Sequence, residues 1–160
     1  MHSRIYRISE KPISKENFTK ESSYYDDGFV GEIADYVSEV DYRSNDYISD
    51  LEWLQTATEG LEVNIKKGTI TILNKKEYFD KKHDKFKELI ENLQDITLED
   101  FSSNKEYFTI LDLKSAYDDK YSFYIDDNYE NVGLTSLDNW VRNAEENKKY
   151  YVGNILDYHF

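Results

Sequence analysis

The sequence predicts an α+β fold: a single domain over residues 1–160, with a mainly antiparallel sheet (two hairpins plus terminal strands) packed with about three amphipathic helices. Two patterns predict it. Segments in which apolar and polar residues alternate, typical of half-buried strands, are interleaved with segments whose apolar residues recur every three or four positions, typical of helices. In addition, 160 residues is close to the usual size of one domain, and no linker or repeat divides the chain.

The N-terminal part contains one predicted strand, one loop and one predicted helix. Residues 3–8 alternate and are expected to form a strand, and the polar stretch 12–27, which starts with the only proline, is expected to be a loop. From residue 29 the apolar spacing becomes four, four and three. This spacing predicts a helix whose buried side carries Phe29, Ile33, Val37 and Val40.

A second helix and a hairpin follow. Residues 44–46 (Ser-Asn-Asp) are N-cap candidates for a helix that ends at Gly60 and turns Ile48, Leu51 and Leu54 inward. Residues 61–65 and 70–72 alternate around Lys66-Lys67-Gly68, which predicts a β-hairpin with Gly68 at positive φ.

The lysine-rich stretch 76–94 has the clearest helical periodicity. One stripe carries its apolar residues, and lysines cover much of the rest, so Phe86 and Ile90 are expected to be buried. The stripe consists of Phe79, Phe86, Leu89, Ile90 and Leu93.

The C-terminal part is predicted to contain a second hairpin, a short helix and a last strand. Apolar and polar residues alternate over 109–113 and 121–125, which favours a hairpin. Ser103 with Glu106 also fits a capping box that would open a helix, so residues 105–117 could be strand or helix. Thr135 with Asp138 resembles a capping pair before a short amphipathic helix. A strand at 150–158 that paired with the first strand would bring His2 and His159 together. The expected core is Ile33, Val37, Leu51, Leu54, Val63, Ile70, Phe86, Ile90, Leu111, Phe123 and Trp140.

Composition and motifs exclude several function classes. The chain has no cysteine, which excludes thiol nucleophiles, disulfides and iron–sulfur clusters. No apolar run approaches the roughly 18 residues of a membrane helix, and the start has no signal-peptide core, so a cytoplasmic protein is expected. The three histidines show no ligand spacing, and the six scattered glycines form no phosphate-binding loop. We therefore expect no enzyme activity, no cofactor and no metal.

One segment partly fits a calcium loop. Asp126, Asn128 and Glu130 have the spacing of the first ligands, but Asn131 stands where the loop needs glycine and Leu137 where it needs glutamate. A solvated acidic loop is therefore preferred to a calcium site.

Charge is divided unevenly along the chain. The whole chain has net charge −13, residues 22–65 contain eleven acidic residues and only Arg43, and residues 91–160 have net charge −9. Residues 66–90 between these blocks have net charge +4. Such a negative field repels nucleic acid and anionic membranes and attracts basic proteins.

The first acidic block supplies the candidate binding residues. The predicted helix that begins at Phe29 would place Glu32, Asp35 and Glu39 in a row of carboxylates, with neighbours about 5–6 Å apart. A basic partner would relieve the repulsion between them. Interleaved tyrosines could stack on lysine and arginine. The predicted partner-binding residues are Asp26, Asp27, Glu32, Asp35, Tyr36, Glu39, Asp41, Tyr42, Asp46 and Asp50.

These features predict a protein that acts by binding a basic protein. By analogy of charge and size alone, a small acidic chain without cysteine fits inhibitors that imitate nucleic acid, such as phage anti-restriction and anti-CRISPR proteins. The partner would then be a nucleic-acid-handling enzyme whose basic surface the inhibitor occupies. Alternatives are an immunity protein or antitoxin that neutralises a basic toxin, another protein-interaction module, and an enzyme working through carboxylates.

Overall fold

The structure is a computed structural model that describes residues 1–127 and 133–160. It is an α+β protein, as the sequence predicts, built on a seven-stranded sheet with the order β3-β4-β7-β1-β5-β6, in which β2 also pairs with β7. Every described ladder is antiparallel except β1–β5. The strands are β1 His2–Ser9, β2 Tyr36–Val40, β3 Leu61–Asn64, β4 Thr69–Ile72, β5 Tyr124–Asp126, β6 Leu134–Ser136 and β7 Lys149–His159.

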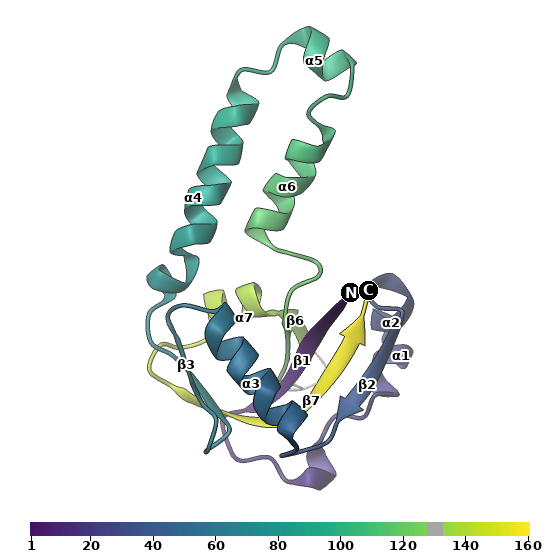
Figure 1. Cartoon of the computed structure of the whole chain (residues 1–160), viewed down its shortest axis with the longest axis vertical. Coiled ribbons are helices and arrows are strands. Elements are labelled where there is room, and N and C mark those ends of the chain that lie inside the picture. The colour runs from purple at the N-terminus through teal and green to yellow at the C-terminus, as the bar shows by residue number, and fades with distance from the viewer. Residues whose placement is uncertain (128–132) are drawn as a thin grey trace.

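The long strand β7 organises the sheet. Along one side it pairs with β1, and along the other it pairs first with β4 and then with β2. The two termini therefore meet, as Figure 1 shows, and His2 lies opposite His159 with ring centroids 4.9 Å apart. The predicted terminal strands and the β3–β4 hairpin are confirmed.

Helices cover both faces of the sheet. On one face α3 (Asn45–Ala57) and α7 (Leu137–Asn143) pack over Tyr6, Ile8 and Ile155 in the larger core cluster. On the other face lies a smaller cluster around Ile5, Tyr24, Phe29 and Tyr158, under the single turns α1 (Ser23–Asp26) and α2 (Phe29–Glu32). A 3-10 turn, η1 (Lys15–Asn17), precedes them.

The sheet and the helices packed on its two faces form the body of the protein. The N-caps of its helices α3 and α7 lie at, or one residue from, the predicted positions. Ser44 caps α3 by accepting a hydrogen bond from the Tyr47 N–H, as predicted, and Leu51 and Leu54 are buried. At α7 the cap is Ser136, which accepts from the Asn139 N–H, one residue later than the predicted Thr135.

The predicted helix over residues 29–40 is wrong. Only one turn forms, because Val30 and Gly31 leave helical geometry and Gly31 takes a φ of 106°. The chain then enters β2. Val37 is buried there because alternate side chains of a strand face the core, and not because of helical spacing. Pairing with β7 supplies the backbone hydrogen bonds that a helix would have supplied.

Three helices form an arm that projects from the sheet (Figure 1). They are α4 (Lys75–Gln94), α5 (Leu98–Ser102) and α6 (Tyr107–Tyr117), and α4 packs along α6. The 76–94 helix is confirmed, whereas the predicted strand at 109–113 is wrong: this segment is α6, the helical alternative. The capping box lies at Thr97 and Asp100 and opens α5, not at Ser103 and Glu106.

The arm accounts for the main errors in the predicted core. Ile90 and Leu111 are exposed, and Phe86 is only half-buried, because α4 and α6 leave the sheet and have only each other to pack on. Ile48 of α3 is also exposed, and Ile33 and Phe123 are half-buried. The remaining predicted core residues are buried: Val37, Leu51, Leu54, Val63, Ile70 and Trp140.

Candidate interaction surfaces

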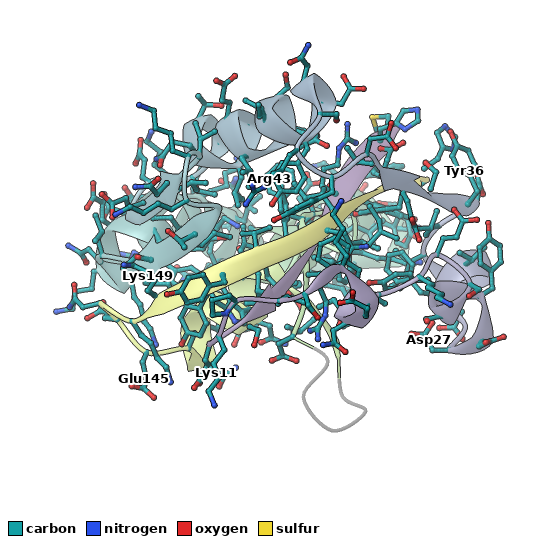
Figure 2. The ribbon with its side chains drawn as sticks, turned by 90° about the horizontal axis from the view of Figure 1, so that it is seen from below. Lys11, Asp27, Tyr36, Arg43, Glu145 and Lys149 are labelled. Atoms are coloured by element: carbon teal, nitrogen blue, oxygen red, sulfur yellow. The ribbon has the colours of Figure 1, made fainter. Side chains whose placement is uncertain are left out.

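The first candidate surface is a set of exposed acidic side chains beside β2, here called the acidic edge. It spans α1, α2, β2 and the start of α3, and the described residues give its acids no ion pair with lysine or arginine. Figure 2 shows Asp27 and Tyr36 at the same end of the molecule, both turned outward. Its members are Asp26, Asp27, Glu32, Asp35, Glu39, Asp41 and Asp46, with Tyr36 among them.

The acidic edge has a different geometry from the predicted row. Glu32 ends the α2 turn, Asp35 precedes β2, and Glu39 lies within β2, so helical spacing does not set their separations. Asp35 is held by the His159 imidazole, with Oδ2 and Nδ1 3.1 Å apart, and Tyr36 stacks on the same ring at 5.3 Å. The free edge of β2 thus combines exposed carboxylates with an exposed tyrosine.

Two predicted binding residues do not belong to this surface. Asp50 is buried and pairs with Arg4, whose Nε lies 2.7 Å from Oδ1. Burial raises the pKa of Asp50 from its ordinary value, and the Arg4 charge opposes this rise. Tyr42 is half-buried between the rings of Phe18 and Tyr47. The carboxylate of Asp50 is therefore enclosed in the body, and the ring of Tyr42 is partly covered by side chains of the body.

The second candidate surface is the arm, which the sequence analysis did not single out. No residue of α6 is buried, although seven of its eleven residues are apolar or aromatic. The exposed large hydrophobic side chains of the arm include Leu98 at 83%, Phe101 at 76%, Phe108 at 73% and Ile110 at 52%. A helix that is apolar on all sides is normally covered on all sides. The all-round apolar pattern of residues 107–117 was the available sequence signal.

The outer part of the arm is acidic, whereas the whole arm, residues 75–117, contains ten acidic residues and eight lysines, for a net charge of −2. Residues 88–113 contain seven acidic residues and one base, Lys105, for a net charge of −6. Lys105 is already paired with Asp100 at 2.9 Å. Four exposed acids of this stretch make no ion pair with the described residues: Glu91, Asp95, Glu99 and Asp112.

A buried polar network fixes the base of α4 to the body. The Asp138 carboxylate, 1% exposed near the start of α7, accepts a hydrogen bond from the Tyr78 hydroxyl at 2.7 Å and pairs with Lys82. Burial, followed by the Asp138 charge, raises the pKa of Tyr78 well above its ordinary value, so the phenol stays protonated and donates.

Arg142 of α7 fixes the base of α6. Its guanidinium lies 4.3 Å from the centre of the Tyr117 ring, and its Nη2 donates to the Tyr117 carbonyl at 2.5 Å. The same guanidinium lies over Phe79 of α4. Two helices of the arm, α4 and α6, are therefore anchored to α7 at their bases.

A cleft of about 460 Å³ lies where the arm meets the body. Trp53, Tyr78 and Phe123 line it together with Lys82 and Asp138, which are paired with each other. The described residues contain no cluster of three side chains that could hold a metal ion. Most of the calcium-like segment lies outside the described residues. Its first residue, Asp126, is buried and accepts hydrogen bonds from Thr19 and Tyr24.

Comparison of the chain with known protein families, curated proteins and solved structures finds no match. Within residues 1–127 and 133–160, no helix is both long and apolar enough to cross a membrane.

Proposed function

We propose that this protein is an acidic inhibitor that binds a basic protein, and that the partner is a nucleic-acid-handling enzyme whose nucleic-acid-binding surface it occupies. The observation that carries the proposal is the acidic edge: seven exposed carboxylates on β2 and on the segments that flank it in the chain, with no lysine or arginine paired to them among the described residues. Uncompensated charge of one sign attracts a partner of the other sign and favours rapid, salt-sensitive association.

Charge imitation supplies a simple mechanism. A surface that binds duplex phosphates presents lysines and arginines, and carboxylates form charge-assisted hydrogen bonds with the same groups. Occupation of that surface excludes nucleic acid without any chemical step. Tyr36, exposed among the acids, offers a ring on which an arginine of the partner can stack.

The test is competition. Purified restriction enzymes and CRISPR nucleases would each be mixed with labelled duplex DNA and increasing amounts of this protein, and the displaced DNA would be measured. We expect displacement from at least one enzyme and weaker displacement at higher salt, because exposed charges are screened beyond about 8 Å at physiological ionic strength.

The informative variant reverses three charges of the acidic edge: Glu32→Lys, Asp35→Lys and Glu39→Lys. We expect it to lose displacement. Its matched control, Glu62→Lys, Glu77→Lys and Asp80→Lys, makes the same change in net charge at exposed positions outside the edge and should retain it. Equal loss in both variants would show that overall charge, and not the acidic edge, governs binding, and displacement retained by the edge variant would place binding elsewhere. Failure to displace DNA from any of the enzymes would contradict the proposed function.

A further inference from the structure

The arm exposes apolar surface that the fold does not use. Monomeric proteins rarely expose large contiguous apolar patches, and those that do generally use them for binding. Along α6, Tyr107, Ile110 and Leu111 lie three and four positions apart and are all exposed, so they form a stripe on the side of the helix away from α4. Phe101 of α5 and Phe108 add two more exposed rings near the tip.

Charge decides between two possible occupants of this stripe. A second copy of the chain would bring another stretch of net charge −6 against the first, at an apolar contact where repulsion is poorly screened. A basic partner would instead meet Glu99 of α5, Asp112 of α6 and Asp95 at the end of α4, none of which forms an ion pair within the described residues, whereas Lys114 is the exposed lysine of α6. The acidic rim therefore favours a basic occupant.

We propose that the arm binds a basic amphipathic helix, which lies along α5 and α6 as an additional helix of the arm. Its apolar side would cover Phe101, Phe108, Ile110 and Leu111, and its lysines or arginines would pair with the surrounding acids. Side chains three and four positions apart along the bound helix would anchor it, as in other complexes in which an amphipathic helix lays its apolar side on a hydrophobic surface. The inference rests on the proposed function in one respect: the helix would belong to the same basic partner.

The fixed base of the arm supports this role. Because Asp138 and Arg142 hold the bases of α4 and α6, the stripe is presented in one orientation before binding. A preorganised surface loses less conformational entropy when it binds, which strengthens the complex.

The experiment uses a defined probe with the full chain. A synthetic 18-residue peptide of leucine and lysine, with leucines at helical spacing, would be titrated with the protein and followed by calorimetry and far-UV circular dichroism. We expect binding that weakens as salt rises and that increases the helical signal of the peptide. A peptide with glutamate in place of lysine should not bind.

Two variants locate the site. Phe108→Ser with Ile110→Ser should weaken binding at least about tenfold, as expected when central anchors of an interface are removed. The matched control, Ile48→Ser with Leu73→Ser, removes two exposed aliphatic side chains of the body and should bind like the wild type. Unchanged melting of both variants would show that they fold.

The outcomes separate this inference from the proposed function. The variant with Glu32, Asp35 and Glu39 changed to lysine should still bind the peptide at physiological salt while it fails to displace DNA from the enzyme. Equal affinity of the peptide for the Phe108/Ile110 variant and the wild type would overturn the arm site and leave the acidic edge standing. Self-association that the Phe108/Ile110 variant abolishes would show that a second copy covers the stripe, which would also overturn the inference.

Discussion

The body and the arm use apolar side chains in opposite ways. In the body, β7 buries Tyr150, Val152, Ile155, Leu156 and Tyr158 between layers on both faces of the sheet. In the arm, α6 is comparably apolar and buries none of its residues. The difference lies in what the fold places against each segment: β7 has helices or turns on both faces, whereas α6 packs along α4 and meets Arg142 of α7 at its last residue. Hydrophobicity alone therefore does not distinguish core residues from exposed residues in this chain.

Tyrosine shows the same division. Burial raises the pKa of six tyrosines that are buried in the body or at its junction with the arm; that of Tyr124 rises to about 12. The other five are Tyr6, Tyr24, Tyr47, Tyr78 and Tyr158. The hydroxyls of Tyr6 and Tyr47 donate to backbone carbonyls inside the core.

The largest expected effect is a loss of stability at alkaline pH. The folded protein holds these phenolic protons more tightly than the unfolded chain, whose tyrosines titrate near pH 10. The stabilisation is therefore complete below about pH 10 and is lost as pH rises through the folded pKa values, by about 1.4 kcal/mol per pH unit for each tyrosine that ionises only on unfolding. Urea unfolding between pH 8 and 12 would measure it.

A single variant checks the origin of this effect. Tyr124→Phe removes a phenol whose pKa is about 12, so its stability should fall less steeply than that of the wild type between about pH 10 and 12. A wild-type free energy of unfolding that stayed constant up to pH 12 would show that these tyrosines are not buried as described.

A matched pair of leucine substitutions gives the next largest effect. Leu54 of α3 is fully buried, and Leu98 of α5 is 83% exposed. Leu54→Ala should lower the free energy of unfolding by about 2–5 kcal/mol, through lost burial and the cavity left behind. Leu98→Ala should change it by less than about 0.5 kcal/mol, as at ordinary surface positions. Chemical denaturation of both variants would decide, and a large loss for Leu98→Ala would mean that the arm tip is packed.

The same contrast explains which sequence predictions succeeded. The terminal strands, the β3–β4 hairpin, α3 and α4 were predictable because local patterning and tertiary packing agree there, as at Ser44 and Leu51. Residues 29–40 were misassigned because helical and strand spacing both account for Val37, and only the pairing with β7 decides. Phe86 was expected to be buried because periodicity identifies the apolar side of a helix but not whether the helix lies on the body.

The candidate surfaces were predictable to different degrees. The acidic edge was found from charge counts, although Asp50 and Tyr42 had to be removed from it, because sequence does not show that Arg4 lies beside Asp50. The arm surface was missed because residues 109–113 alternate as in a strand, and alternation hid a helix that is apolar all round.

The smallest of these effects concerns the junction between body and arm. Tyr78→Phe removes the hydroxyl that donates to the buried Asp138 carboxylate at 2.7 Å. A hydrogen bond to a charged group contributes about 1.5–3 kcal/mol, so the free energy of unfolding should fall by about that amount. The control, Tyr107→Phe, removes a hydroxyl that makes no hydrogen bond within the described residues and should be neutral. Amide hydrogen exchange in the first turns of α4 should accelerate in the Tyr78 variant alone. Equal exchange in both variants would mean that Lys82 and Arg142 hold the arm without Tyr78, and that the junction is fixed by charge and ring contacts and not by this hydrogen bond.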